Sequence, residues 1–232
     1  MGQSALLRWL GRRRYGIMKQ IILASASPRR AELLRGLGLE FKVVPSEVPE
    51  IHQEQLTGRE LAQVNAYRKT RAVAKKYPDD LVIGADTLVC LGETVFGKPA
   101  TLEEAYEMLE RLQGRTHQVV SAICLLHLRS HRQKVFAEAS AVTFRRLDAV
   151  AIRRYLQKVN PLDKAGAYAI QEQSDLLVEK MAGSYTNVVG LPLERLKVEL
   201  DAWGGLAFSG QAPLEVLAGT HAQFGSRMTA RR

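Results

Sequence analysis

The order of apolar and polar residues along the chain predicts short strands that alternate with helices. Apolar runs of strand length, bounded by polar or turn-forming residues, predict strands at 19–24, 41–44, 81–91, 118–128 and 134–144. Apolar residues at helical spacing predict helices at 29–37, 57–76, from 101 onward, near 148–157 and at 193–202. Strands that alternate with helices are typical of a layered α/β domain built around a mixed sheet.

Two helix starts and one hairpin carry local signatures. Residues 57–60 (Thr-Gly-Arg-Glu) and 101–104 (Thr-Leu-Glu-Glu) both match a capping box, in which a threonine and a glutamate side chain satisfy the first free N–H groups of a helix. The residues Leu-Gly-Glu-Thr at 91–94 are typical of a tight hairpin turn. The polar stretch 45–55 predicts a loop.

Composition narrows the class of protein. The chain has 232 residues, 46% of them hydrophobic and 25% charged, which suits one large folded domain and excludes a chain that is disordered throughout. No uninterrupted apolar run approaches the roughly 20 residues that a membrane span needs. Cys90 and Cys124 cannot form a disulfide scaffold, so we expect a reducing compartment and a cytoplasmic protein.

Charge and composition mark off the two ends. Of the formal net charge of +9, residues 1–17 hold +4 and residues 18–200 hold +4, an excess that suits small anions as well as a polynucleotide. We interpret 1–17 as a dispensable basic extension; a surface amphipathic segment, a targeting peptide or a start at Met18 are alternatives. The domain is expected at 18–203, and 204–232 is expected to be a loosely ordered tail.

A strand that runs into two serines and two arginines is the first candidate for chemistry. Ser25 and Ser27 precede a proline, and Arg29 and Arg30 fall in the first turn of the predicted helix. Helix N–H groups, hydroxyls and guanidinium groups all bind phosphate oxygens. The alternative is a capped helix with solvent-exposed arginines. The spacing of a Walker loop is absent.

The second candidate is an aspartate inside an apolar strand. Burial of Asp86 is costly unless it is paired or binds a metal, and Thr87 places a hydroxyl beside it. A strand-end aspartate that caps a turn is the alternative. Downstream, Lys98 in a Gly-Lys-Pro turn could neutralise phosphate, although such a turn is common without any function.

The third candidate is the segment 161–171. Asp163, Lys164 and the small residues that lead to Gln171 would suit a wall that shapes a base pocket, and a loop-to-strand junction is an equal alternative.

Taken together, these motifs resemble one known family. Ser-Ala-Ser-Pro-Arg-Arg at 25–30, Gly-Ala-Asp-Thr at 84–87, Gly-Lys-Pro at 97–99 and Val-Val-Gly-Leu-Pro-Leu at 188–193 resemble, in order and spacing, the Maf family of nucleoside triphosphate pyrophosphatases. Residues 163–168 with Gln171 resemble the branch that hydrolyses dTTP and UTP. The resemblance implies a strongly twisted mixed sheet with two lobes around a central cleft, as in Maf and ITPase proteins.

The resemblance also implies a reaction and residue roles. The reaction would give a monophosphate and pyrophosphate with Mg²⁺, or alternatively Mn²⁺. Asp86 matches the catalytic base, and Glu50 with Asp86 matches the metal-binding acids. Arg30, Lys69 and Lys98 match the basic positions that stabilise the triphosphate. Arg29 is a neighbouring candidate for phosphate binding, and Ser25 and Ser27 could donate to phosphate oxygens. Positions that match substrate choice are Arg30, Thr87 and Gln171.

Two other functions remain open from the sequence. One is a pyrophosphatase for non-standard purine nucleotides, and the other is a non-catalytic nucleotide-binding regulator of cell division. The leading hypothesis is an enzyme that cleans the nucleotide pool. We expect no stable nucleic-acid partner and no membrane span, and the family implies a homodimer.

Overall fold

The computed structural model of the protein describes residues 20–53 and 55–203. The predictions for segments 1–17 and 204–232 therefore fall outside the described residues. Within them, no helix is long and apolar enough to cross a membrane.

A mixed sheet of seven strands forms the centre of the fold, in the order β2-β1-β3-β5-β6-β7, with β4 paired to β3. Its strands are β1 (Ile21–Leu23), β2 (Phe41–Val43), β3 (Leu81–Leu91), β4 (Thr94–Phe96), β5 (Thr116–His127), β6 (Arg132–Phe144) and β7 (Val178–Ala182). Strand β1 runs parallel to both β2 and β3, and all other pairs are antiparallel. The predicted α/β fold with a mixed sheet is confirmed.

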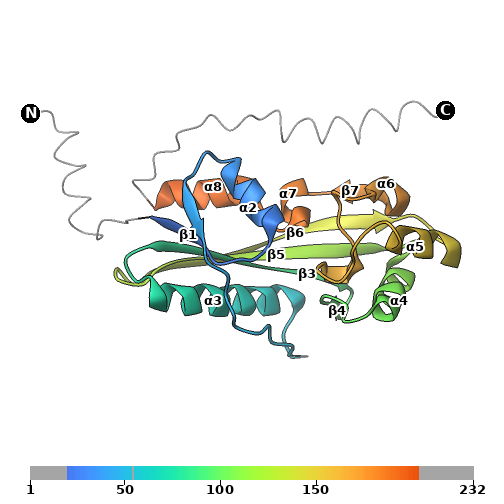
Figure 1. The fold of residues 1–232 in the computed structure, drawn as a ribbon, viewed down its shortest axis with the longest axis horizontal. Helices are drawn as coiled ribbons and strands as arrows, with labels where there is room; N and C mark the ends of the chain where they lie inside the picture. Colours follow the sequence, from blue (N-terminus) through green and yellow to red (C-terminus); the bar gives the residue numbers. More distant parts are fainter. Residues whose placement is uncertain (1–19, 54, 204–232) are drawn as a thin grey trace, which may run out of the picture.

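Helices cover both faces of the sheet. They are α2 (Pro28–Arg35), α3 (Gly58–Lys76), α4 (Leu102–Leu112), α5 (Ala149–Leu156), the 3₁₀ turn η1 (Ala165–Ala167), α6 (Ser174–Leu177), α7 (Tyr185–Val189) and α8 (Leu193–Ala202). Helix α3 lies on one face, and α2 and α8 lie on the other (Figure 1). The long strands β3, β5 and β6 continue to the other end, where α4, α5 and α6 pack, so two lobes share one sheet.

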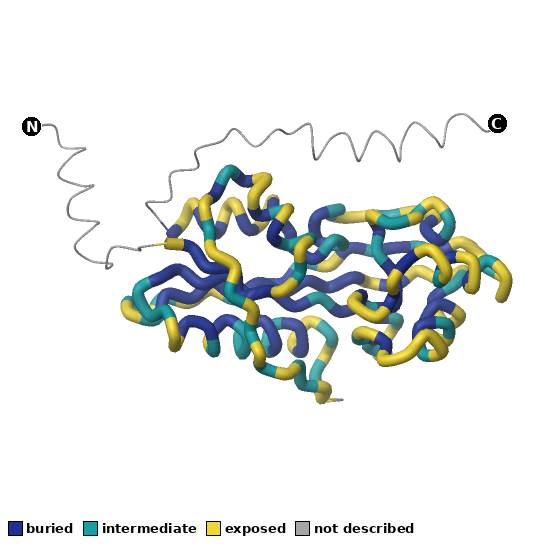
Figure 2. Tube along the Cα trace, viewed as in Figure 1, coloured by how far each residue is buried: buried dark blue, intermediate teal, exposed yellow. Residues whose placement is uncertain are grey.

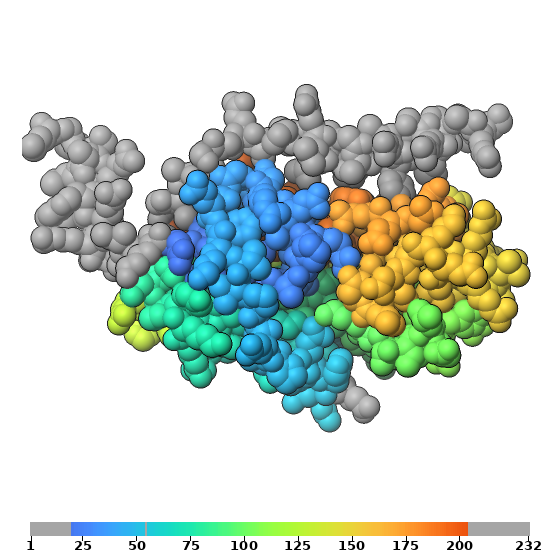
Figure 3. Space-filling model, viewed as in Figure 1, coloured from blue at the N-terminus to red at the C-terminus, as the bar shows by residue number. Residues whose placement is uncertain are grey.

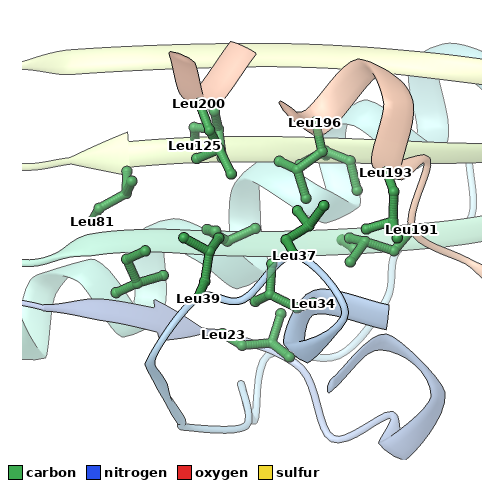
Figure 4. Close-up of a cluster of buried hydrophobic side chains, with 14 of the residues drawn as sticks. Leu23, Leu34, Leu37, Leu39, Leu81, Leu125, Leu191, Leu193, Leu196 and Leu200 are labelled. Atoms are coloured by element: carbon green, nitrogen blue, oxygen red, sulfur yellow. The ribbon is translucent and has the colours of Figure 1, made fainter. Parts of the chain in front are cut away.

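The hydrophobic core follows these layers. Strands β1, β3 and β5 are buried along most of their length, whereas many residues of the connecting loops are exposed (Figure 2). Figure 4 shows the leucine cluster between the sheet and α2 and α8, in which Leu34 of α2 lies near Leu23 of β1 and Leu200 of α8 lies near Leu125 of β5. Because apolar side chains removed from water stabilise a fold roughly in proportion to their area, this packing fixes α2 on the sheet.

The predicted local signatures have two outcomes. At the start of α3, Thr57 and Glu60 form the complete capping box. At the start of α4, the prediction is wrong in one half: the Thr101 hydroxyl accepts from the Glu104 N–H, but the Glu104 carboxylate accepts from the N–H of Ala100 instead of Thr101. The carboxylate therefore satisfies a donor in the preceding loop.

The sequence pattern misses the short elements near the end of the domain. No strand occurs at 161–171, so that segment is not the loop-to-strand junction that was one alternative. Strand β7 was not predicted because it is a sheet edge with three exposed residues out of five, and it has no apolar run. Helix α7 is only five residues long, too short to show helical periodicity.

A gap in the pairing of β3 positions the site. Strand β1 pairs with Leu81–Ile83, and β4 pairs with Val89–Leu91, on the same side of β3. Residues 84–88 between them pair only with β5. This stretch of strand edge, next to the point where β1 ends and α2 begins, is therefore open to other groups.

Candidate active site

A cavity of about 590 Å³ lies at the gap in β3. Its walls come from the β1–α2 connection, the loop before α3, strand β3, the turn at Lys98 and the segment 163–171. In the space-filling view, the blue N-terminal residues lie next to the orange residues of the later segment (Figure 3). All the predicted site residues line this cavity: Ser25, Ser27, Arg29, Arg30, Glu50, Lys69, Asp86, Thr87, Lys98 and Gln171.

The first wall is built by the start of α2. Ser27 is the N-cap of this helix, its hydroxyl accepts from the Arg30 N–H, and Pro28 occupies the first turn. The buried Ser25 hydroxyl accepts from the N–H of Ser27 at 3.2 Å. The two serines therefore shape the turn, as the alternative interpretation of a capped helix expects, while both also line the cavity.

One lysine lies between two carboxylates at the centre of the cavity. The Lys69 Nζ atom lies 2.6 Å from Asp86 Oδ1 and 2.7 Å from Glu50 Oε1. Lys98 Nζ lies 3.6 Å from the same Glu50 oxygen. The other Asp86 oxygen, Oδ2, is buried without a hydrogen-bond partner among the described residues. These four residues come from four separate segments of the chain.

The two carboxyl groups have opposite pKa shifts. Burial raises the pKa of Asp86 above its usual range, and the nearby Glu50 charge adds to this, although Lys69 works against it. Burial alone would also raise the pKa of Glu50, but Lys69, Lys98 and Arg30 together hold that pKa below its usual range. Asp86 is therefore the stronger proton acceptor of the pair.

Arg30 is largely engaged by the protein itself. Its Nε donates to Gly190 O at 2.9 Å, one terminal nitrogen donates to Ser25 Oγ and Ala85 O, and the other donates to Thr87 Oγ1 at 2.8 Å. A guanidinium group has five N–H donors, so one remains for a ligand. Arg30 contributes positive charge and holds Thr87 in place, and its capacity for direct phosphate contact is small.

Arg29 links the two sides of the cavity. Its NH1 atom lies 3.3 Å from Asp163 Oδ2 and 3.7 Å from Glu172 Oε1. The same two carboxylates pair with the buried Lys164 Nζ at 2.8 and 3.3 Å. Sequence analysis found no partner for Arg29, because 134 residues separate it from Asp163. Gln171 lies beside Glu172 on this wall.

Apolar residues form part of the lining of the cavity. Val89, Val119, Tyr168, Ile170 and Val188 all line it. The sequence does not mark these residues as functional candidates, because an apolar residue has the same signal whether it faces the core or a ligand.

A glycine brings the wall formed by the segment 163–171 close to β3. Gly166 has a φ of +66°, and a Cβ atom there would lie 2.9 Å from a methyl group of Val89. Its N–H donates to Gly97 O at 2.9 Å, which joins this wall to the turn that carries Lys98. Only glycine permits this approach.

The donor set fits a hard divalent cation only in part. Among residues 20–53 and 55–203, no cluster of three or more His, Cys, Asp or Glu side chains forms a complete metal site. Glu50 and Asp86 nevertheless both accept a hydrogen bond from Lys69, and Asp86 Oδ2 has no hydrogen-bond partner within the described part of the chain. Two carboxylates suit an ion such as Mg²⁺ that takes its remaining ligands from phosphates and water.

The fold and the site thus define an α/β protein whose cavity, lined by charged and apolar residues, suits an anionic organic ligand. A family model described as "Maf-like protein" matches residues 20–203. The chain belongs to the Maf family.

Curated relatives agree with this assignment. A protein of Pelotomaculum thermopropionicum named dTTP/UTP pyrophosphatase is 46% identical over 81% of this chain and 98% of its own length. A protein of Alkaliphilus oremlandii with the same name is 45% identical over 79% of this chain and 95% of its own length. Among solved structures, the Ham1 protein of Staphylococcus aureus is 20% identical over 80% of this chain and all of that chain, with a TM-score of 0.47.

Proposed function

We propose that the protein hydrolyses dTTP and UTP, and modified pyrimidine nucleotides of the same shape, to the nucleoside monophosphate and pyrophosphate. The names of the relatives support this substrate class. The observation that carries the proposal is that Asp86, Lys69, Glu50 and Lys98 meet in one cavity that apolar residues also line.

In the proposed reaction, water attacks the α-phosphorus and the bond to the bridging oxygen of the β-phosphate breaks. Asp86 accepts the proton of the attacking water, because its raised pKa makes it a better base than an exposed aspartate. The electron pair of the broken bond leaves with pyrophosphate. Lys69 and Lys98 stabilise the negative charge that develops on the phosphate oxygens.

Phosphate binding is assigned to the start of α2 and to the lysines. Ser25, Ser27 and Arg29 face the same cavity, and a triphosphate would compete with Asp163 for Arg29. Glu50 and Asp86 would hold a divalent metal, which is Mg²⁺ in this proposal with Mn²⁺ as the alternative. When bound, such an ion neutralises phosphate charge.

Base selection is assigned to the opposite wall. Gln171 presents an amide, which can both donate to and accept from the polar edge of a pyrimidine. Thr87 and Arg30 fix the shape of the wall on the β3 side, since their side chains hydrogen-bond each other. A homodimer and a cytoplasmic location stay predictions.

A nucleotide panel tests the function. Incubation with Mg²⁺ and separate pyrimidine and purine triphosphates, followed by measurement of pyrophosphate, should show turnover of dTTP and UTP. Preference for non-standard purines would support the related pyrophosphatase, and no turnover with any nucleotide would favour a non-catalytic regulator.

The matched variant is Asp86→Asn, which keeps the size of the side chain and removes the base. Hydrolysis should fall by about 10²-fold or more, while nucleotide affinity, measured by calorimetry, changes little because binding rests mainly on the cations. Unchanged turnover in this variant would remove Asp86 from the mechanism.

A further inference from the structure

The loop that carries Glu50 has little backbone support of its own. It connects β2 to α3, and Val44 N–H still donates to Leu23 O at its start. Among the described residues, 45–52 take part in no backbone–backbone hydrogen bond. The position of the Glu50 carboxylate therefore depends on side chains that reach the loop from elsewhere.

Helix α3 supplies these side chains. Arg68 NH1 donates to Pro49 O at 3.0 Å, and Lys69 binds the Glu50 carboxylate itself. One turn earlier, Asn65 contacts the residue after Glu50 twice: Asn65 Oδ1 accepts from Ile51 N–H at 3.0 Å, and Asn65 Nδ2 donates to Ile51 O at 3.2 Å. Three consecutive loop residues are thus held by one face of the helix.

Of these three helix residues, Asn65 is the buried one. It is 1% exposed and occupies an inward-facing position of α3, as Leu61 and Ala66 do. Asparagine is a poor helix residue and a costly one to bury unless it is hydrogen-bonded. Here its amide hydrogen-bonds both the N–H and the C=O of Ile51, as a residue of a neighbouring strand would. The two bonds together fix the position and the orientation of the loop backbone at Ile51.

We propose that Asn65 is a positioning residue that holds Glu50 against Lys69 and Asp86 through the backbone of Ile51. Asn65 lies one helical turn from Lys69, so the helix sets the spacing between the two contacts. Loss of the amide would leave the Ile51 N–H and C=O without these partners, and the loop would shift to regain hydrogen bonds. This inference rests on the proposed function, in which Glu50 binds the metal.

The test compares Asn65→Leu, which has a similar shape without hydrogen bonds, with Thr70→Val on the same helix. Thr70 is also fully buried, but its hydroxyl donates within the helix to Ala66 O at 2.6 Å. In Asn65→Leu we expect Mn²⁺ affinity, measured by electron paramagnetic resonance without substrate, to fall by about 10- to 100-fold, as for other residues that orient metal ligands. Thr70→Val should keep the wild-type affinity.

Two further readouts separate positioning from general destabilisation. Amide hydrogen exchange at Ile51, followed by NMR, should accelerate in Asn65→Leu and stay unchanged in Thr70→Val. In a Glu50→Gln background, Asn65→Leu should add less than about a twofold loss of metal affinity or activity, because two changes on one pathway are not additive. If Asn65→Leu does not fold, Asn65→Asp keeps the acceptor for Ile51 N–H, loses the donor to Ile51 O, and should still weaken Mn²⁺ binding.

Wild-type Mn²⁺ affinity in the Asn65 variants would overturn the inference, as would an equal loss in Thr70→Val or a full additional loss on top of Glu50→Gln. A wild-type protein that hydrolyses no nucleotide would instead defeat the proposed function, and the Mn²⁺ and exchange measurements would still decide the role of Asn65.

Discussion

Replacement of Lys69 with methionine would remove the cation that two carboxylates share. Methionine keeps the length and most of the apolar stem of the side chain, so the change is mainly one of charge. Asp86 and Glu50 would then lie close together without the ammonium group that binds both.

The size of the effect follows from burial. Removal of one partner of a buried ion pair costs about 3–5 kcal/mol, because a charge is left uncompensated. The side chains of Lys69 and Asp86 are only 14% and 3% exposed, so this pair is nearly as buried as the pairs to which that cost applies. The Glu50 side chain is 24% exposed, and water partly screens its charge. We expect a loss of about 3 kcal/mol in the free energy of unfolding at pH 7. For a chain of this size, that is a drop of roughly 6–12 °C in Tm.

The loss should depend on pH in a defined direction. The pKa of Asp86 is already raised in the folded protein, and removal of Lys69 raises it further. A carboxyl with a higher pKa in the folded than in the unfolded state destabilises the fold once the pH rises above the unfolded value of about 3.9. The penalty therefore grows as the pH rises from about 3.9 toward the raised folded pKa, and it shrinks as the pH falls toward 4.

Urea denaturation at pH 7 and at pH 4.5 measures this penalty. Lys75→Met, an exposed change on the same helix, is the matched control and should stay within about 0.5 kcal/mol of wild type. The double variant Lys69→Met/Asp86→Asn should recover most of the loss. A loss below about 0.5 kcal/mol that is the same at both pH values would refute the reasoning.

Three further predictions concern other parts of the site and core. With Asp86 as the base, kcat/KM should fall on the acid side as the pH drops through its raised pKa, and a flat acid limb would contradict this. Gly190 has a φ of +120°, and a Cβ atom there would lie 3.3 Å from Arg30 Nε, so Gly190→Ala should lower stability by about 1–3 kcal/mol and reduce activity. In the control Gly92→Ala, the added Cβ meets no described atom within 4 Å, and activity should stay near wild type. Burial raises the pKa of the Cys124 thiol to about 12, so a thiol reagent at pH 8 should label it only after unfolding, as mass spectrometry would show.

Much of the fold could be predicted because its main elements have strong local signals. Strand β3 was predicted with its observed bounds, because a largely apolar run of this length, flanked by polar residues, is typical of a buried strand. Helix α3 was predicted from its capping box, which depends only on residues three apart. Strand β7 and helix α7 lack such signals and were missed.

The membership of the site could also be predicted, but the part each residue plays could not. Motif order identified Arg30 as a phosphate ligand, whereas the structure gives four of its five N–H groups to protein acceptors. Arg29 was recognised, while its partners Asp163 and Glu172 were not paired with it.

The amino-acid sequence by itself therefore determined the class of fold, the main strands and helices, and the set of charged residues available for chemistry. The tertiary structure alone decided that Lys69 lies between Asp86 and Glu50, and that Asn65 holds the loop beside them. Apolar periodicity and capping depend on residues that lie only a few positions apart in the chain. Hydrogen bonds between segments many residues apart depend instead on how helices and strands pack, and the packing creates the cavity.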